Sequence, residues 1–243
     1  MKNMKIKRLS VVIPAYNEIK TIRRILEEVD GVNLRGVEKE VVIIDDGSSD
    51  GTREVLRKLP KKYVVEFHKE NRGKSAAVKT GLLKTTGDLV IVQDADLEYD
   101  PNDYLKMLKP FERAEADVVY GSRFKGEGPH RMIYFSNMIA NKFLTFLSNL
   151  FTGYNLSDME TCYKMFRGDL IREIAPTLTA TRFGFEPEVT AKLSKRKVKL
   201  YEVGISYYGR TIEEGKHIRF RDGLKAIWEI IKYNKFSKTT KKT

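Results

Sequence analysis

Four carboxylates occupy alternate positions in the stretch QDADLEYD, residues 93–100: Asp94, Asp96, Glu98 and Asp100. They come directly after the apolar run LVIV, which is typical of a buried strand. In an extended chain Asp94, Asp96 and Glu98 would point to one side and repel one another by about 1 kcal/mol or more per close pair. A divalent cation would relieve that repulsion, and Mg²⁺ or Mn²⁺ accepts carboxylate oxygens together with substrate phosphates. The spacing predicts a metal site; the alternative is an acidic turn in which Asp100 caps the next helix.

A second acidic stretch, VVIIDDGSSDGT at residues 41–52, also follows an apolar run. Its glycines permit a tight turn, and its serines and Asp50 could cap the following helix. These roles leave Asp45 and Asp46 unexplained. Both could accept hydrogen bonds from the ring N–H or the hydroxyl groups of a ligand.

The stretch NRGKSAAVKTG, residues 71–81, has part of a phosphate-binding loop pattern. The full pattern requires glycine at position 68, where this chain has His68, so we reject an NTPase loop. Lys74 at a helix start could still bind an anion, or it could be ordinary surface charge. The sequence leaves both interpretations open.

Other catalytic signatures are absent from the sequence. No GxGxxG follows the first predicted strand, which argues against a dinucleotide oxidoreductase, and there is no GxSxG nucleophile motif. The single cysteine, Cys162, and the scattered His68, His130 and His217 make no zinc or thiol pattern.

The chemistry-bearing stretches fall between elements that alternate strand and helix. Strands that are apolar throughout, separated by helices, predict an α/β fold with a mostly parallel central sheet covered on both faces. The polar stretches then follow the first, second and fourth strands and should meet at one edge of the sheet. We expect strands at 9–16, 40–46, 63–69 and 88–94, and helices at 18–30, 50–59 and 73–86.

After residue 100 the alternation is less regular. We expect a single domain over residues 1–235, followed by a basic, disordered tail at 236–243. The predicted elements are helices at 101–114, 130–151, 168–175, 185–196 and 222–233, strands at 117–123 and 198–206, and a strand or turn at 161–166.

Composition limits the class of protein and its compartment. Of the 243 residues, 41% are hydrophobic and 32% charged, which suits a folded protein with a charged surface. The net charge of +12 would suit a polyanionic partner or simply solubility, but no aromatic platform is interleaved with the basic residues, so nucleic acid is not expected. One cysteine, no signal peptide and no apolar run of about 18 residues predict a cytoplasmic protein, or one peripheral to the membrane on its cytosolic face.

Four motifs together resemble the inverting family 2 glycosyltransferases with the GT-A fold. They are VVIPAYNE, VVIIDDGSSDGT, GDLVIVQDADLEYDP and DVVYGSRF, in this order, within residues 8–125. The polyprenyl-phosphate sugar transferases, which include dolichol-phosphate mannose synthase-like enzymes, are the most similar branch. The resemblance implies a hexosyltransferase that takes its sugar from a UDP- or GDP-sugar.

The resemblance also implies roles for individual residues. Asp94 and Asp96 match the metal-binding D-x-D, with Glu98 as a third ligand of Mg²⁺ or Mn²⁺, and Asp96, Arg123 and Asp158 would act in catalysis. Arg123, Arg210 and Lys216 would bind phosphate. The donor would be bound by Pro14, Ala15, Tyr16, Glu18, Asp46, Lys74 and Asp94.

The resemblance leaves the acceptor open. A saccharide hydroxyl needs a general base, for which Asp158 is the matching position, whereas a polyprenyl phosphate is already ionised and needs none. The apolar helix at 131–151 could lie on a membrane surface, in a homodimer or against the core, and the last helix with its basic tail could add attraction to anionic lipid. We expect a polyprenyl phosphate acceptor and peripheral membrane contact.

Overall fold

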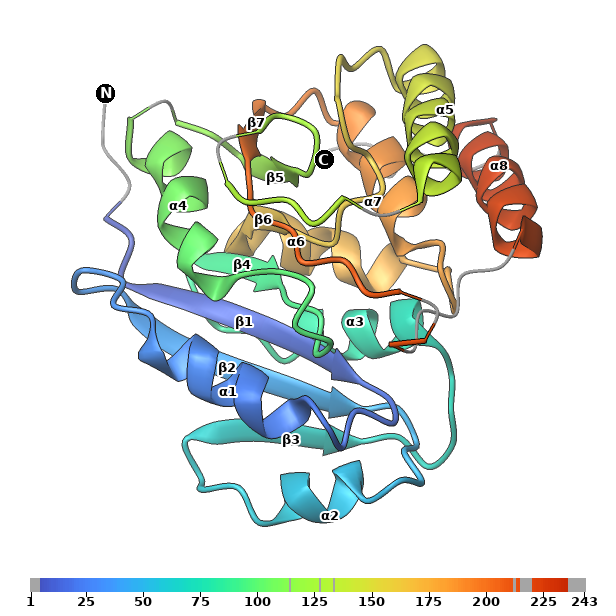
Figure 1. The fold of residues 1–243 in the computed structure, drawn as a ribbon. Coiled ribbons are helices and arrows are strands. Elements are labelled where there is room, and N and C mark those ends of the chain that lie inside the picture. The colour runs from blue at the N-terminus through green and yellow to red at the C-terminus, as the bar shows by residue number, and fades with distance from the viewer. Residues whose placement is uncertain are drawn as a thin grey trace.

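The computed structural model describes residues 5–113, 115–126, 128–132, 134–211, 213–214 and 220–235, except for the side chains of 220–222. Its centre is a seven-stranded sheet in the order β3-β2-β1-β4-β6-β5-β7. Of these strands, β6 runs antiparallel to its neighbours and the others pair in parallel (Figure 1). The predicted α/β fold with a mostly parallel sheet is confirmed.

The four strands of the first half are the apolar runs of the sequence. Val11, Val12 and Ile13 of β1 are fully buried, as are the first three residues of β4. β-Branched side chains fit a sheet covered on both faces, which explains why these runs do not alternate with polar residues. The elements are β1 (Arg8–Ala15), α1 (Ile22–Gly31), β2 (Glu38–Asp45), α2 (Thr52–Arg57), β3 (Tyr63–Phe67), α3 (Lys74–Leu82) and β4 (Leu89–Val92).

The strand order reverses between β1 and β4. The chain adds β2 and then β3 on one side of β1, and then returns through α3 to place β4 on the other side. Because such crossovers are right-handed, α1 and α2 cover one face of the sheet and α3 covers the opposite face. The carboxyl ends of β1 and β4 therefore border the crevice in which open α/β sheets bind ligands.

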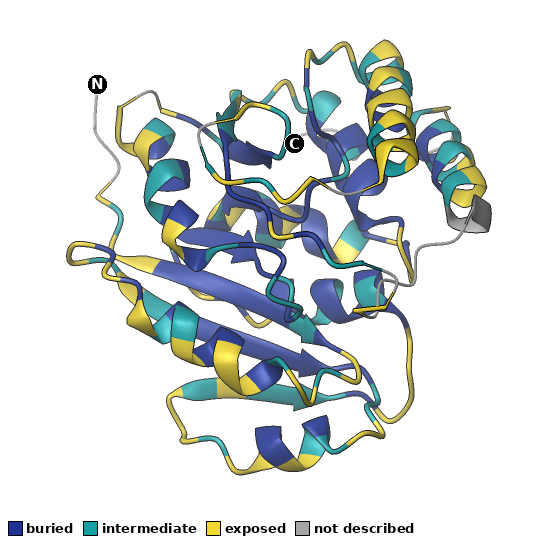
Figure 2. Ribbon diagram, in the orientation of Figure 1, coloured by how far each residue is buried: buried dark blue, intermediate teal, exposed yellow. Residues whose placement is uncertain are grey.

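The second half completes the sheet and adds helices beside it. The segment for which the sequence left strand or turn open contains β6, which pairs with both β4 and β5. Figure 2 shows that burial concentrates on the central strands and the sides of the helices facing them. The elements are the 3₁₀ turn η1 (Pro101–Asp103), α4 (Tyr104–Arg113), β5 (Val118–Ser122), α5 (Phe135–Thr152), β6 (Lys164–Arg167), α6 (Gly168–Ile174), the 3₁₀ turn η2 (Ala175–Thr177), α7 (Phe185–Ser194), β7 (Leu200–Gly204) and α8 (Phe220–Lys235).

Two sequence predictions fall outside the described residues. Lys216 and the tail at 236–243 lie there, so their predicted roles stay predictions. Within the described part of the chain, no helix combines the length and the apolar character needed to cross a bilayer.

Candidate active site at the carboxyl edge of the sheet

The acidic stretch forms a turn rather than a continued strand. β4 ends at Val92, and Leu97 has a φ of 64°, in the left-handed region that extended strands do not use. The expectation that Asp94, Asp96 and Glu98 point to one side of a strand is therefore wrong. In this turn Asp94 pairs with Lys74, whereas Asp96 and Glu98 both contact Arg210.

Asp94 is paired with Lys74, the first residue of α3. The Lys74 Nζ lies 2.7 Å from Asp94 Oδ1 and 3.8 Å from Glu186 Oε1. Burial lowers the pKa of Lys74, but the neighbouring negative charges, Asp94 foremost and Glu186 among them, together outweigh burial and raise the pKa well above its usual value. Lys74 is therefore a fixed positive charge at the end of β4, rather than ordinary surface charge.

Two backbone N–H groups in the first turn of α3 are occupied by a neighbouring loop. The N–H of Ser75 donates to the carbonyl oxygen of Arg182 at 2.9 Å, and that of Ala76 donates to the carbonyl oxygen of Thr181 at 3.1 Å. The 181–182 loop approaches so closely that a Cβ on Gly73 would overlap the Thr181 carbonyl oxygen. These two backbone N–H groups are therefore engaged within the protein, and anion binding by the Lys74 side chain stays a prediction.

Asp46 holds the loop that leads into α3. Its carboxylate accepts hydrogen bonds from the backbone N–H of Arg72 at 3.0 Å and of Gly73 at 2.7 Å, and it contacts His68 Nδ1 at 2.7 Å. Asp46 is almost fully buried and so positions Lys74 indirectly. Its predicted contact with the donor base stays a prediction. Its neighbour Asp45 is buried in an ion pair with Arg53 at 2.6 Å.

Asp96 is paired with an arginine from the far end of the sequence. Arg210 Nη2 donates to Asp96 Oδ2 at 2.8 Å. Burial, and then the charges of Asp94 and Glu98, raise the pKa of Asp96 to about 7, although Arg210 opposes the shift. The site thus concentrates negative charge and compensates part of it with Lys74 and Arg210.

Glu98 anchors the segment that carries Arg210. Its carboxylate accepts hydrogen bonds from the Arg210 N–H at 2.7 Å and the Tyr207 hydroxyl at 2.8 Å, and its carbonyl oxygen accepts from the Tyr208 N–H at 2.8 Å. Sequence analysis missed this positioning role and missed Tyr207 altogether. The only available signal was the aromatic pair before Arg210 in YYGR.

Arg123 and Asp158 form a buried bidentate pair. Arg123 Nε donates to Asp158 Oδ2 at 2.7 Å, Arg123 Nη2 donates to Asp158 Oδ1 at 2.8 Å, and the Arg123 N–H adds a third bond at 3.0 Å. The guanidinium also lies over the Tyr207 ring, 5.2 Å from its centroid. Burial opposes the charge on Arg123, yet Asp158 raises the pKa of Arg123 well above its usual value. The structure brings these two predicted catalytic residues together.

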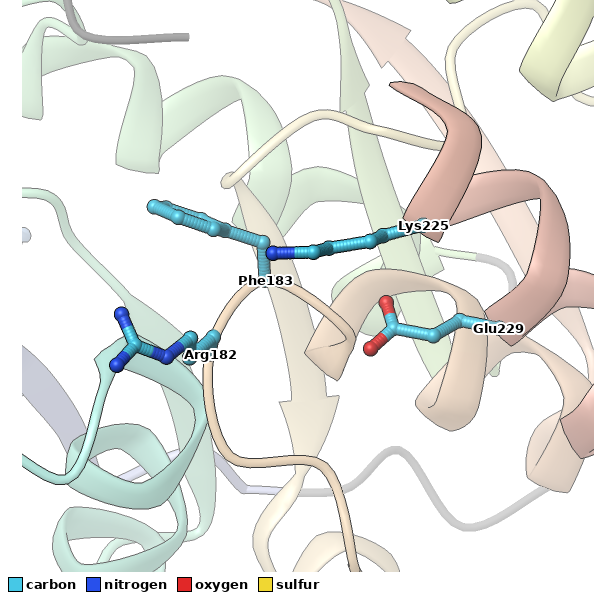
Figure 3. Close-up of a pocket in the computed structure, with 4 residues that line it drawn as sticks. All are labelled: Arg182, Phe183, Lys225 and Glu229. Carbon is cyan, nitrogen blue, oxygen red and sulfur yellow. The ribbon is translucent and has the colours of Figure 1, made fainter. Parts of the chain in front are cut away.

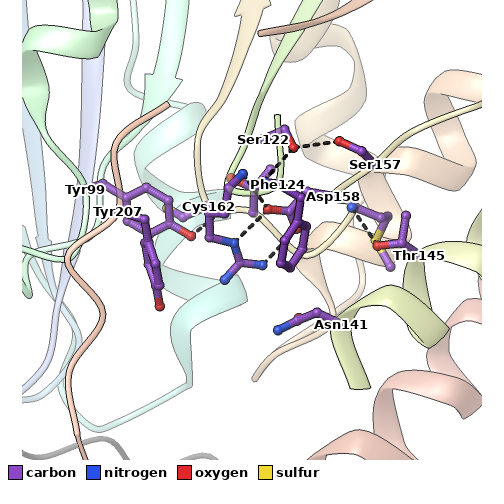
Figure 4. Close-up of polar contacts among 12 residues, drawn as sticks. Tyr99, Ser122, Phe124, Asn141, Thr145, Ser157, Asp158, Cys162 and Tyr207 are labelled. Carbon is purple, nitrogen blue, oxygen red and sulfur yellow. Dashed lines mark hydrogen bonds and ion pairs between the residues drawn. The ribbon is translucent and has the colours of Figure 1, made fainter. Parts of the chain in front are cut away.

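Hydrogen bonds to two other elements hold the loop that presents Asp158, and Figure 4 shows Thr145 beside this loop. Glu202 of β7 accepts hydrogen bonds from the backbone N–H of Ser157 at 2.9 Å and of Asp158 at 3.1 Å. Thr145 of α5 accepts one from the Met159 N–H at 3.0 Å. Sequence analysis missed Glu202, and a single glutamate in a strand gave no local signal for this role.

The predicted donor-binding residues lie at the end of β1. Pro14 and Ala15 are its last two residues, and the Ala15 carbonyl oxygen accepts a hydrogen bond from the Asp46 N–H at 2.8 Å. Tyr16 is exposed, whereas burial raises the pKa of Glu18, which accepts a hydrogen bond from the Thr21 hydroxyl at 2.7 Å. These residues border the same crevice as Asp94 and Asp96.

Comparison with known families matches residues 10–175 of this chain to the family described as glycosyl transferase family 2. The match covers more than half of the sequence and includes β1, β4 and the acidic turn. The chain belongs to glycosyl transferase family 2. It is therefore a nucleotide-sugar-dependent glycosyltransferase.

Two similar curated proteins act on dolichyl phosphate, according to their names. The UDP-N-acetylglucosamine–dolichyl-phosphate N-acetylglucosaminyltransferase of Methanococcus voltae is 26% identical over 93% of this glycosyltransferase and 95% of its own length. The dolichyl-phosphate beta-glucosyltransferase of Dictyostelium discoideum is 27% identical over 91% of this chain and 76% of its own length.

Solved structures confirm the fold. The glucosyl-3-phosphoglycerate synthase of Mycobacterium tuberculosis, in complex with Mn²⁺, UDP and glucosyl-3-phosphoglycerate, superimposes with a TM-score of 0.68 at 19% identity. The match covers 93% of this glycosyltransferase and 78% of the synthase. The GT-A expectation for the fold is thereby confirmed.

The acidic turn fits a divalent cation only in part. Within the described residues, no three carboxylate, histidine or cysteine side chains converge as a ready metal site. Asp94 and Asp96 would supply hard oxygen ligands. Burial, and then the charge of Asp94, raise the pKa of Asp96, and a dication would relieve the repulsion between the two carboxylates. Glu98 is engaged by Arg210 and Tyr207, so its role as a third ligand stays a prediction.

Proposed function

We propose that this glycosyltransferase moves a hexose from a UDP- or GDP-sugar to a polyprenyl phosphate, with inversion at the anomeric carbon. Support comes from the names of both curated relatives, which specify dolichyl phosphate as the acceptor, and one of which specifies a UDP-sugar. The observation that carries the proposal is the pairing of Asp94 with Lys74 and of Asp96 with Arg210 at the carboxyl end of β4.

This arrangement suits a diphosphate that arrives with a dication. Asp94 and Asp96 would hold Mg²⁺ or Mn²⁺, which when bound neutralises charge on the leaving nucleoside diphosphate. Lys74 and Arg210 would exchange their carboxylate partners for phosphate oxygens. A guanidinium is well suited to this because it offers parallel N–H donors and stays charged at any working pH.

The state of Asp158 favours an acceptor that needs no base. Both oxygens of its carboxylate accept hydrogen bonds from Arg123 inside the protein. Taking a proton from a hydroxyl would break this pair and leave Arg123 buried with an uncompensated charge, which is costly. We therefore assign Asp158 to positioning Arg123, and assign Arg123 to binding phosphate.

The reaction balances without proton transfer. An oxygen of the ionised polyprenyl phosphate forms a bond to the anomeric carbon from the side opposite the leaving group. The bond from that carbon to the donor diphosphate breaks, and the nucleoside diphosphate leaves with the electron pair. The residues of this chain bind and orient the two substrates and neutralise the charge that develops on the leaving group. Such electrostatic stabilisation is usually the largest single contribution to catalysis.

The experiment that tests the proposal has two stages. Thermal-shift screening of UDP- and GDP-sugars, with and without Mn²⁺, should show one donor that raises the melting temperature in a metal-dependent way. That donor is then incubated with a short, water-soluble polyprenyl phosphate and, separately, with simple saccharides. Product with the lipid phosphate supports the proposal, whereas product with saccharides alone would overturn it in favour of a hydroxyl acceptor.

The Asp96→Asn variant tests the predicted role of Asp96 in binding the metal ion. Asparagine is nearly isosteric with aspartate, so the protein should stay folded while transfer is lost. Unchanged activity of Asp96→Asn at saturating Mn²⁺ would contradict the role of this carboxylate.

A further inference from the structure

The outer side of α5 exposes a continuous apolar stripe. Large side chains recur at spacings of three and four along the helix, which places them on one face. Each is between 51% and 70% exposed. The stripe consists of Phe135, Ile139, Phe143, Phe146 and Leu150, and Figure 2 shows the exposed side of α5 turned away from the rest of the molecule.

The opposite side of α5 faces the candidate active site. Leu144, Thr145 and Ser148 are buried there, and Thr145 accepts the hydrogen bond from Met159 described above. Figure 4 shows Asn141 and Thr145 on the side of α5 that faces Asp158. One helix diameter, about 10 Å, therefore separates the exposed stripe from the loop that carries Asp158.

Helix α8 extends the stripe. It packs beside α5 (Figure 1), and Lys235 Nζ lies 5.8 Å from the centre of the Phe151 ring at the end of α5. Leu224 is 55% exposed and Trp228 is 60% exposed. We call the α5 stripe together with Leu224 and Trp228 the apolar surface.

Basic side chains surround this surface. The α5 sequence contains Lys142 and no acidic residue, and Lys225, Lys232 and Lys235 of α8 are exposed. Next to α8, a groove is lined by Arg182, Phe183, Lys225 and Glu229 (Figure 3). An exposed apolar face with a basic border matches the chemistry of an anionic lipid surface.

We propose that the apolar surface docks this protein on an anionic lipid bilayer, with its apolar side chains among the lipid chains and its lysines at the headgroups. A second copy of this chain fits less well. A two-fold dimer brings the same patch against itself, so lysines would largely face lysines; α5 has no acidic residue, and Glu229 is the one acidic residue among the described residues that line the groove beside α8.

Docking through this surface would bring the lipid acceptor close to the candidate active site, an inference that rests on the proposed function. With the apolar side chains of α5 among the lipid chains, the Asp158 loop and its partner Arg123 lie about one helix diameter farther out, close to the headgroups. The phosphate of a membrane-embedded polyprenyl chain sits at headgroup level, so only a short displacement would bring it to Arg123. Docking would thus present the acceptor directly to the site.

The single tryptophan of the chain provides an intrinsic probe, because Trp228 lies in the apolar surface. Vesicles of phosphatidylcholine and phosphatidylglycerol should shift its fluorescence to shorter wavelength and sediment the protein. Pure phosphatidylcholine vesicles should do so more weakly, and high salt should weaken binding to the anionic vesicles. Failure of the wild-type protein to bind either vesicle would overturn the proposal.

Paired variants identify the surface. Phe146→Ser with Leu150→Ser should lower the partition coefficient onto anionic vesicles by at least about tenfold, because two apolar side chains no longer insert. Leu83→Ser is the matched control, since Leu83 is 49% exposed at the end of α3 and should bind as the wild type does. Equal binding by all three proteins would overturn the assignment.

Two further measurements distinguish membrane docking from dimer formation, and a failure of docking from a failure of the proposed function. Light scattering of the wild type and the double variant reports a dimer directly, and a dimer lost in the double variant would assign the surface to a second copy instead. Transfer to the short, water-soluble polyprenyl phosphate should be unaffected by Phe146→Ser with Leu150→Ser. If vesicle binding fails while that transfer persists, the docking inference falls and the proposed function stands.

Discussion

Arg210 and Asp96 lie 114 residues apart in the sequence and form a hydrogen-bonded ion pair of 2.8 Å at the end of β4. Together with the Lys74–Asp94 pair, it places protein cations on the two carboxylates predicted to hold a metal ion. A dication arriving alone must compete with these cations, whereas one arriving with a diphosphate gives them a new partner. Metal and donor should therefore bind cooperatively.

Arg210→Gln should strengthen the binding of Mn²⁺ alone by about tenfold, because one competing charge is removed from the site. The same change should weaken binding of the nucleoside diphosphate in the presence of Mn²⁺. Free Mn²⁺ measured by electron paramagnetic resonance, with and without UDP or GDP, reports both effects. Arg8→Gln is the control, since Arg8 lies in an exposed ion pair with Glu38. Weaker or unchanged Mn²⁺ binding in Arg210→Gln would rule out this competition.

The buried Arg123–Asp158 pair should show strong coupling in stability. Asp158→Asn alone should lower the free energy of unfolding by about 3–5 kcal/mol, because it leaves Arg123 buried without its counter-charge. In an Arg123→Gln background the same substitution should cost much less. Denaturant unfolding of the four proteins measures the coupling. Additive effects of the two substitutions would show that the pair is not the structural unit described here.

Glu160 should make stability fall as the pH rises. Burial, and then the charge of Glu186, raise the pKa of Glu160 from 4.5 to about 8, and its Oε1 is buried without a hydrogen-bond partner among the described residues. A raised folded-state pKa means that the folded protein holds the proton more tightly. The stability from this group is therefore complete below pH 4.5 and is lost as the pH rises through about 8.

The neutral variant Glu160→Gln should remove this loss. Its melting temperature relative to the wild type should increase steadily between pH 4.5 and about 8. Melting curves across this range test the prediction, with Glu28→Gln, at a partly exposed position on α1, as the control. A difference between Glu160→Gln and wild type that does not change with pH would contradict it.

Gly73 should be intolerant of a side chain both because of its backbone angles, φ 93° and ψ 156°, and because the 181–182 loop lies close to it. Gly73 has a φ of 93° and Gly36 a φ of 94°, but of these two only Gly73 would have a Cβ that overlaps neighbouring backbone, at Thr181 and Arg182. Gly36→Ala should cost about 1–2 kcal/mol from the left-handed conformation alone. Gly73→Ala should cost at least about 2 kcal/mol more and weaken donor binding, because Lys74 moves with it.

Unfolding and donor titrations of the two alanine variants test this comparison. Equal losses of stability in Gly36→Ala and Gly73→Ala would show that the 181–182 loop yields without cost. In that case the 181–182 loop would not be rigidly packed against the first turn of α3 in the wild-type protein.

The sequence predicted the elements well where local patterns are strong. The buried runs at residues 11–13 and 89–92 could only be strands covered on both faces, and the polar stretches after them had to meet at one edge of a parallel sheet. Asp94 and Asp96 were predicted from their residue types and their position after a buried strand, which is local information. Arg123 and Asp158 were predicted only through the resemblance to the family.

The partners of those residues were not predictable in the same way. Lys74 meets Asp94 because the chain reverses direction through α3, and Arg210 meets Asp96 because Glu98 fixes a segment more than 100 residues away. The left-handed turn at Leu97 separates carboxylates that an extended chain would have aligned. Periodicity and local propensity determined which segments are strands and helices, because those depend on neighbouring residues. The charge balance of the site was decided only by tertiary packing, because ion pairs form between whichever groups the fold brings within a few ångströms, and sequence distance does not limit that.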